Sequence, residues 1–106
     1  MANKDVGSVY HFGVFANMRE IYLRKHKEKL YKKMRESGEL EKHLRAFQYH
    51  HAVIAEKMHQ KLAEERGVNH QLLRLNYIEW VSETVKIQEE VREYMIQLIN
   101  SNMQKS

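Results

Sequence analysis

The sequence predicts an all-α protein, an elongated antiparallel three-helix bundle. The chain contains no proline, and its four glycines stand at Gly7, Gly13, Gly38 and Gly67. Apolar side chains between the glycines recur at alternating steps of three and four residues, the spacing that places them on one face of an α-helix. We expect helices over residues 14–36, 39–66 and 69–101, joined by connections short enough to make neighbouring helices antiparallel.

Size and composition fit one soluble domain. The chain has 106 residues, of which 42% are hydrophobic and 30% charged, and its mean hydropathy is -0.73. No apolar run approaches the roughly 20 residues of a membrane helix, and the first residues lack the apolar stretch of a secretion signal. We expect a cytoplasmic protein with an arm over residues 1–13 and a single helical domain over residues 14–106. Because cysteine is absent, disulfides and thiolate sites are excluded.

Local signals mark where the predicted helices end. Ser37 and Gly38 follow a turn rich in Lys and Arg, and cations suit the negative carboxyl end of a helix. Gly67 gives the same signal for the second helix. Asn69 then predicts the start of the third helix, since its side chain can accept a hydrogen bond from a free backbone amide.

The second and third predicted helices carry clear apolar seams. The seam of the second helix consists of Leu40, Leu44, Phe47, His51, Ile54 and Met58. The third helix carries two adjacent seams. One consists of Leu73, Tyr77, Trp80, Thr84, Ile87, Val91, Tyr94 and Leu98, and the other of Ile78, Val81, Val85, Gln88, Met95 and Ile99. So broad a face can contact two helices of the bundle, or it can leave a strip exposed for a homodimer through the third helix.

The first predicted helix is less regular. Its best apolar stripe consists of Phe15, Met18, Tyr22, His26, Leu30 and Met34. This stripe predicts that His26 points inward. The five consecutive polar residues 25–29 weaken the stripe at its centre, so one continuous helix and two short helices both remain open.

Positive charge is concentrated in this first helix. Residues 19–35 contain eight basic and two acidic side chains, a net charge of +6, whereas residues 36–106 carry a net charge of -2. The predicted binding residues, which we call the basic face, are Arg19, Arg24, Lys25, Lys27, Lys29, Lys32, Lys33, Arg35 and Tyr31. Such a rod attracts phosphate backbones without reading sequence, and an interleaved tyrosine can stack on a base. The alternatives are an acidic protein surface as partner, or a helix face that is only solvated.

The sequence gives little support for catalysis or metal binding. None of the seven histidines is three or four residues from another, the spacing that would place two imidazoles over one metal ion on a helix. The adjacent pairs Glu64–Glu65 and Glu89–Glu90 point in different directions on a helix and form no carboxylate dyad. No nucleophile elbow or phosphate-cradling glycine loop is present. We therefore expect no enzyme, no metal and no cofactor.

One stretch of sequence resembles a known family. The residues that carry the resemblance are Met18-Arg19, Tyr22-Leu23, His26, Leu30-Tyr31, Ser37-Gly38, Leu40 and His43-Leu44. In order and spacing they are similar to the pattern of the TnpV family of transposon-encoded proteins. A weaker similarity continues through residues 63–68 and around Trp80. Relatives place a proline near position 28, where this chain has Glu28, which bears on whether the first helix is broken.

The resemblance implies a context more than a mechanism. TnpV-like proteins resemble small accessory products of conjugative and transposable elements in gut bacteria, with no catalytic residues to transfer to this chain. Two functional hypotheses follow. In the first, the basic face binds DNA, RNA or a nucleoprotein complex as a non-catalytic accessory factor. In the second, the chain is an inhibitor of a host defence nuclease of the anti-CRISPR type, acting by protein or nucleoprotein binding.

Overall fold

The computed structural model describes residues 12–105, so of the predicted arm only Phe12 and Gly13 lie within the described residues. This part of the chain is helical and contains no strand, which confirms the all-α class. It forms five helices: α1 (Val14–His26), α2 (Glu28–Ser37), α3 (Glu39–Glu65), α4 (His70–Leu75) and α5 (Tyr77–Lys105). The prediction of three helices was therefore wrong in number. The chain divides into two compact units, Met1–Ala52 and Val53–Ser106, which we describe separately.

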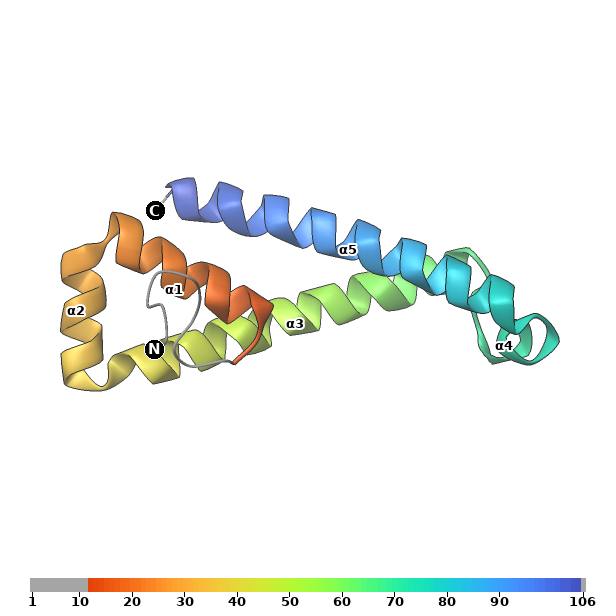
Figure 1. Cartoon of the computed structure of the whole chain (residues 1–106), viewed down its shortest axis with the longest axis horizontal. Helices are drawn as coiled ribbons and strands as arrows, with labels where there is room; N and C mark the ends of the chain where they lie inside the picture. Colours follow the sequence, from red (N-terminus) through yellow and green to blue (C-terminus); the bar gives the residue numbers. More distant parts are fainter. Residues whose placement is uncertain (1–11, 106) are drawn as a thin grey trace, which may run out of the picture. The chain divides into compact units, whose positions relative to one another are not determined.

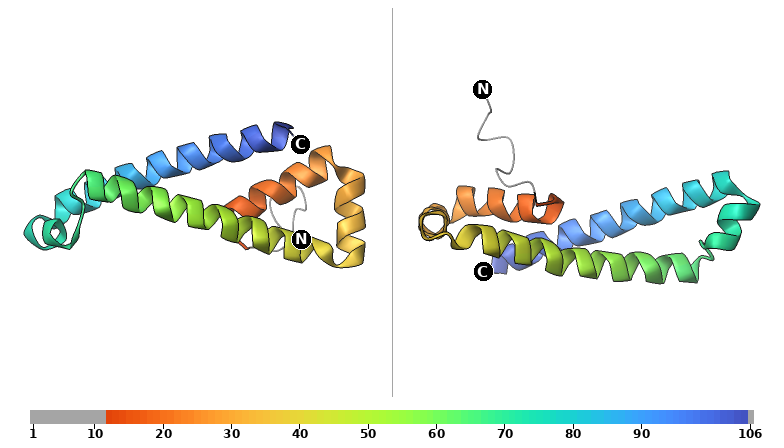
Figure 2. Two further views of the ribbon diagram at one scale, coloured as in Figure 1. Left: turned by 180° about the vertical axis from the view of Figure 1, so that it is seen from behind. Right: turned by 90° about the horizontal axis from the view of Figure 1, so that it is seen from below.

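In the first unit, α1 and the first half of α3 lie side by side and run in opposite directions (Figure 1). The short α2 crosses from the end of α1 to the start of α3, and it is seen end-on in the right-hand view of Figure 2. The chain leaves the helical conformation at Lys27, whose φ of -134° and ψ of 52° separate α1 from α2. This break falls inside the polar run 25–29, where the sequence left the question open.

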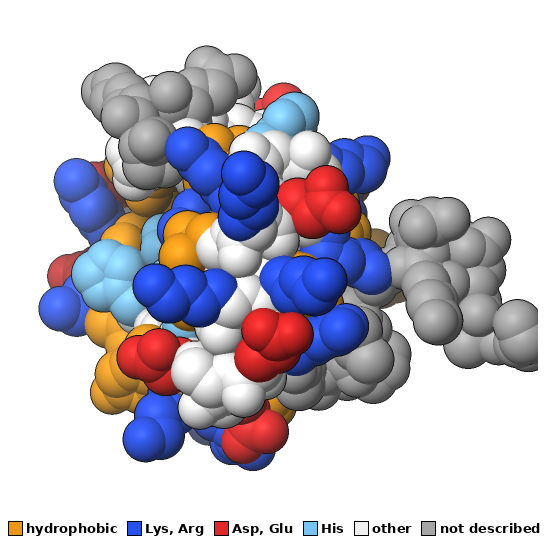
Figure 3. Space-filling model, turned by 90° about the vertical axis from the view of Figure 1, so that its left-hand side faces the viewer, with side chains coloured by type: hydrophobic (Ala, Val, Ile, Leu, Met, Phe, Trp, Pro, Cys, Tyr) orange, Lys and Arg blue, Asp and Glu red, His pale blue; other side chains and the backbone are white. Residues whose placement is uncertain are grey.

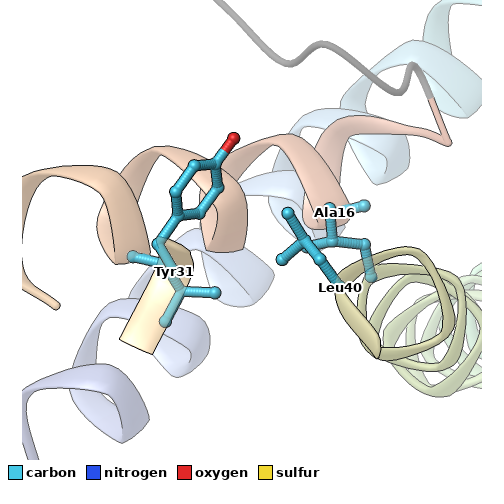
Figure 4. Packing of buried hydrophobic residues seen from close by; sticks show 5 residues of the cluster. Ala16, Tyr31 and Leu40 are labelled. Carbon is cyan, nitrogen blue, oxygen red and sulfur yellow. The ribbon is translucent and has the colours of Figure 1, made fainter. Parts of the chain in front are cut away.

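The core of the first unit is a small cluster drawn from all three of its helices. Its buried members are Ala16, Leu23, Tyr31, Leu40 and Leu44. Figure 4 shows Ala16, Tyr31 and Leu40 converging from α1, α2 and α3. Since Leu23, Leu40 and Leu44 are at most 1% exposed, we expect truncation of any one to alanine to cost about 2–5 kcal/mol.

The predicted stripe of the first helix differs from the face that is buried. In α1 the buried residues are Ala16, Glu20 and Leu23, whereas His26 is exposed. In α2 the buried residue is Tyr31, while its neighbour Leu30 is 44% exposed. The buried face therefore lies about one residue, or 100° of helical rotation, from the predicted stripe. Because the buried face has Glu20 at its centre, it does not form a continuous apolar stripe in the sequence.

A buried hydrogen bond explains how this glutamate is tolerated. The hydroxyl of Tyr31 donates to Oε2 of Glu20 over 3.0 Å, and the Glu20 side chain is fully buried. Burial raises the pKa of the Tyr31 hydroxyl, and the hydrogen bond to Glu20 and the negative charge of Glu20 raise it further. Because a buried polar group is costly unless it is hydrogen-bonded, this contact ties α2 to α1 across the break at Lys27.

The start of α1 is capped by a side chain from α3. Gly13 precedes the helix with a φ of 143°, a conformation that favours glycine, and no side chain of its own can cap the helix. The amide of Ala16 instead donates to Oε1 of Gln48 over 2.9 Å. A Cβ added at Gly13 would clash with the side-chain amide of Gln48. Glycine at this position therefore lets a distant residue satisfy a free helix amide.

The turn between α2 and α3 follows the sequence prediction. Gly38 adopts the left-handed conformation with a φ of 83°, and its amide donates to the carbonyl oxygens of Arg35 and Met34. The hydroxyl of Ser37 lies 3.0 Å from Oε1 of Glu39, the first residue of α3. Chain reversal at Ser37–Gly38 is thus built locally, as the sequence indicated.

In the second unit, α3 ends in a glycine-based turn. The amide of Gly67, whose φ is 68°, donates to the carbonyl of Glu64, and the amide of Val68 donates to that of Ala63 over 2.8 Å. This pair of bonds is the Schellman arrangement, which satisfies the last carbonyls of a helix. Val68 is buried just beyond it. The predicted stop at Gly67 is confirmed.

The third predicted helix is in fact two helices. Asn69 caps α4 by accepting a hydrogen bond from the amide of Leu72, as predicted. Asn76 then interrupts the helix, because its Oδ1 accepts from the amide of Glu79 while its Nδ2 donates to the Glu79 carboxylate. A side chain that satisfies the first amides of a helix favours a new start at that point. The prediction of one helix over 69–101 was wrong for this reason.

An ion pair joins the end of α3 to α5 within the second unit. The Nη1 and Nη2 atoms of Arg66 lie 2.6 and 2.7 Å from the two carboxylate oxygens of Glu90. The hydrogen bond from Arg66 lowers the pKa of the Glu90 carboxyl below its usual range. This two-pronged geometry fixes orientation as well as distance.

The apolar side chains of α5 divide into buried and exposed sets. The buried residues recur at steps of four and are Ile87, Val91, Met95, Ile99 and Met103. Ile78 and Val85, from the second predicted seam, are instead 80% and 45% exposed. The homodimer through this helix stays a prediction.

No helix within residues 12–105 is long and apolar enough to span a membrane.

Candidate functional site

The strongest candidate site is the exposed side of α2. Figure 3 views the molecule from the side on which α2 lies and shows Lys and Arg side chains gathered on this face, with acidic side chains between them. Lys29, Lys32 and Lys33 are exposed, and we call them the α2 lysine row. Their spacing of three and four residues places them on one face of the helix, opposite Tyr31 and Met34.

The local sequence explains why α2 presents its lysines outward. Tyr31 belongs to the core, and Met34 packs against that core. Once these two side chains face inward, the helical period of 3.6 residues directs the lysine row to solvent. Glu36 shares the outer face with the row, and Glu28 begins the helix, so two acids moderate the charge. The net charge of α2 nevertheless stays positive.

The lysines of this region have no acidic partners among the described residues. Within residues 12–105, salt bridges join Arg45 to Glu41, Arg66 to Glu90, and Lys86 to Glu83. None of them involves a lysine of residues 25–33. None of the acidic side chains that the structure describes therefore neutralises this positive charge. An internal neutralisation by the glutamates of α3 or α5 would have removed the candidate site.

The break at Lys27 changes how the remaining basic residues are grouped. Arg24 and Lys25 belong to the last turn of α1, Lys27 is the junction, and the lysine row follows on α2. Lys25 and Lys27 are exposed, whereas Arg24 is partly buried. A continuous helix would have placed Lys25 on the face of Lys29 and Lys32. The break separates these side chains into two helices that point in different directions.

Tyr31, a predicted member of the basic face, belongs to the core, and Arg35 lies over its ring. Tyr31 is 7% exposed, and its hydroxyl is bonded to Glu20, so its ring is not open for stacking on a base. The guanidinium of Arg35 lies 5.9 Å from the centre of the Tyr31 ring, on the outer side of the helix. Arg35 is exposed and keeps its charge at the surface.

Arg19 is set apart from the other basic residues by its surroundings. It is partly buried between α1 and α3, and its Nε donates to Nε2 of His43 over 3.1 Å. This bond places the proton of the neutral imidazole on Nδ1. Burial lowers the pKa of His43, and the positive charge of Arg19 lowers it further. Burial also lowers the pKa of the Arg19 guanidinium.

Two aromatic rings hold the Arg19 guanidinium. Its central carbon lies 5.7 Å from the ring centre of Tyr22 on α1 and 5.7 Å from that of Phe47 on α3. We call Arg19, Tyr22, His43 and Phe47 the arginine clamp. Sequence analysis identified Arg19 as a candidate but did not identify Tyr22, His43 and Phe47 as its partners. Tyr22 and Phe47 were assigned to apolar seams, and no local signal connects Arg19 with a histidine 24 residues away.

The residues that carry the family resemblance fall into two groups in the structure. Leu23, Tyr31, Leu40 and Leu44 form the core of the first unit. Arg19, Tyr22 and His43 meet in the arginine clamp, and the ring of His26 lies 5.1 Å from that of Tyr22. Ser37-Gly38 makes the turn between α2 and α3. The motif thus describes the architecture of the first unit.

These observations define the chain as a small all-α protein with a cationic second helix. The family comparison places it more narrowly: the family model described as "Transposon-encoded protein TnpV" matches residues 3–99. The chain belongs to the TnpV family of transposon-encoded proteins. Neither the curated proteins nor the solved structures gave a match.

Proposed function

We propose that this chain is a non-catalytic accessory protein that binds nucleic acid, or a nucleoprotein complex, through the lysine row of α2 and the neighbouring Lys25 and Lys27. The observation that carries the proposal is the absence of acidic partners for these lysines among residues 12–105, together with their exposure. Closely spaced cations attract a phosphate backbone and release its counterions. Membership in a transposon-encoded family supplies a setting in which DNA is at hand.

The arrangement favours binding without sequence readout. Lysine is a compact point charge that contacts phosphate oxygens, whereas base recognition depends on Arg, Asn or Gln held at a groove. The one tyrosine predicted to stack on bases is buried. Affinity should therefore depend steeply on salt and weakly on sequence.

Fluorescence anisotropy tests the proposal. Labelled duplex DNA, single-stranded DNA and structured RNA are titrated with the protein at two or more salt concentrations. For duplex DNA, the logarithm of the affinity should fall linearly with the logarithm of the salt concentration, with a slope of about -0.9 per phosphate neutralised. The variant with Lys29→Gln, Lys32→Gln and Lys33→Gln should lower that slope by about 2–3 in magnitude.

A matched control separates local from global charge. Lys57→Gln, Lys61→Gln and Lys86→Gln together remove the same net charge from exposed positions in the second unit. This control should leave the affinity within about twofold of the wild type if binding is local to α2. If both triple variants lost the same amount of affinity, binding would depend on the net charge of the protein. That result would refute a binding site on α2.

An absence of binding at low salt would remove the nucleic-acid proposal altogether. The exposed lysines would then be expected to bind an acidic protein surface, as in the hypothesis of a host nuclease inhibitor. Cleavage assays with several CRISPR effectors and excess protein address that hypothesis directly, and unimpaired cleavage would eliminate it.

A further inference from the structure

The arginine clamp contains a cation that has no anionic partner among the described residues. Within residues 12–105, the one hydrogen bond of the Arg19 side chain is the bond from Nε to His43, and no carboxylate forms a salt bridge with it. The guanidinium has five N–H donors, of which Nη1 and Nη2 carry four. Its surroundings are two aromatic rings and a neutral imidazole, none of which compensates a full charge.

This arrangement is unusual for a partly buried arginine. Removing a guanidinium from water is costly unless an anion or several hydrogen bonds compensate for the lost hydration. Another arginine of the first unit that lies over a ring, Arg45, has such a partner. Arg45 lies 4.5 Å from the centre of the Phe12 ring, and its Nε is 3.3 Å from the carboxylate of Glu41.

The clamp also fixes the orientation of the guanidinium. Tyr22 comes from α1, while Phe47 and His43 come from α3, so the plane of Arg19 is constrained from both helices. The bond from Nε fixes that edge of the fork, and the Nη1 and Nη2 edge has no hydrogen-bond partner within residues 12–105. A planar fork held in place binds an oxyanion through parallel hydrogen bonds and loses little rotational freedom on binding.

We propose that the Nη edge of Arg19 is a binding site for one phosphate group. Phosphate is favoured over a carboxylate because residues 24–33 add positive charge to the first unit, which favours the more highly charged anion. The site itself is independent of the lysine row. If the phosphate belongs to a nucleic acid backbone, the inference rests on the proposed function. If it belongs to a nucleotide or is free phosphate, the inference does not depend on that function.

NMR of the arginine side chains tests the site in the unmodified protein. The Nε–Hε signal of Arg19 is followed during titration with inorganic phosphate, with sodium chloride and sodium acetate as references at matched ionic strength. We expect a saturable shift with phosphate, a weaker one with acetate, and none with chloride. The Arg45 signal serves as internal control and should move only as it does in chloride, because the Glu41 carboxylate pairs with the Nε of that guanidinium and offsets its charge.

Several outcomes would overturn the proposal. If the chemical shift of Arg19 changed linearly with phosphate concentration and matched that of Arg45, the response would reflect ionic screening and not binding. A shift with acetate as large as that with phosphate would reassign the site to carboxylates. In either case the phosphate site is removed.

A variant gives a second measurement. Arg19→Lys keeps the charge but replaces the fork with a point charge, and it should abolish the saturable response to phosphate and to a mononucleotide. Affinity for an oligonucleotide should weaken about tenfold, the equivalent of one good charge-assisted contact. An unchanged circular-dichroism spectrum and unfolding midpoint show that the variant is folded. If it fails to fold, the titration of the unmodified protein still decides the proposal.

The two proposals can fail separately. A saturable response to phosphate in a protein that binds no oligonucleotide would support the Arg19 site and remove the nucleic-acid function. Oligonucleotide binding with no change at Arg19 would support the lysine row and remove the clamp as a phosphate site.

Discussion

The hydrogen bond between Tyr31 and Glu20 gives the sharpest test of the fold. Tyr31→Phe removes the hydroxyl and leaves the ring in the core cluster. The lost bond is 3.0 Å long and ends on a carboxylate with no exposed surface. Water therefore cannot replace the hydroxyl without rearrangement. Since a hydrogen bond to a charged group contributes about 1.5–3 kcal/mol, we expect Tyr31→Phe to lower the free energy of unfolding by about 2 kcal/mol.

Urea unfolding followed by helical circular dichroism measures this loss. The matched control is Tyr49→Phe, which removes a hydroxyl from a tyrosine that is 72% exposed on α3 and should change stability by less than about 0.5 kcal/mol. A double-mutant cycle with Glu20→Gln isolates the coupling between the two side chains. If Tyr31→Phe proved as stable as Tyr49→Phe, the packing of α2 described above would be refuted.

The same bond predicts an alkaline limit to stability. Burial and the contact with Glu20 raise the pKa of Tyr31 above its usual value of about 10, so the folded state favours the neutral phenol. The contribution is fully present below pH 10 and is lost as the pH rises through the raised pKa. The stability difference between wild type and Tyr31→Phe should therefore shrink above about pH 10. A difference that grew with pH would contradict the assignment.

Three further perturbations have defined outcomes. Gly13→Ala should cost about 1–3 kcal/mol in urea unfolding, because it strains the backbone and displaces Gln48 from the α1 cap; Gly38→Ala, with open space around it, should cost less. Glu90→Gln should lower the urea midpoint at low salt and have a smaller effect at 1 M salt, because the exposed ion pair it removes is screened. Burial lowers the pKa of His43, so the neutral imidazole contributes to stability above about pH 6.5, and this contribution is lost as the pH falls below that value. In urea unfolding at a series of pH values, His43→Gln should weaken the decrease of the free energy of unfolding towards acid pH.

Local chemistry made most of the helix ends predictable. Gly38 and Gly67 adopt the left-handed conformation that ends a helix, and Asn69 caps the next one. Each signal acts within about four residues of chain, so it can be recognised without knowing the fold. Asn76 acts through the same chemistry and was overlooked, because the apolar seam that runs past it predicts a continuous helix.

The buried face of α1 and α2 was harder to predict. Stripes that differ by one residue lie only 100° apart on a helix, and Leu30 and Tyr31 are adjacent residues that can both pack in a core. The choice between them depends on what the opposite helix offers. Here Glu20 supplies an acceptor for a hydroxyl, so Tyr31 is buried and Leu30 is exposed. Residue type alone would have placed the glutamate outside.

The sequence by itself determined the helical class, the reversals at Gly38 and Gly67 and the concentration of positive charge in residues 19–35, because each depends on neighbours within a turn or two of the chain. The tertiary structure decided which polar groups are buried together. The pairs Tyr31 with Glu20, Gln48 with Ala16, and Arg19 with His43 join residues 11 to 32 positions apart. Such pairs form only when two helices meet in one register, and that register is set by the packing of the whole unit.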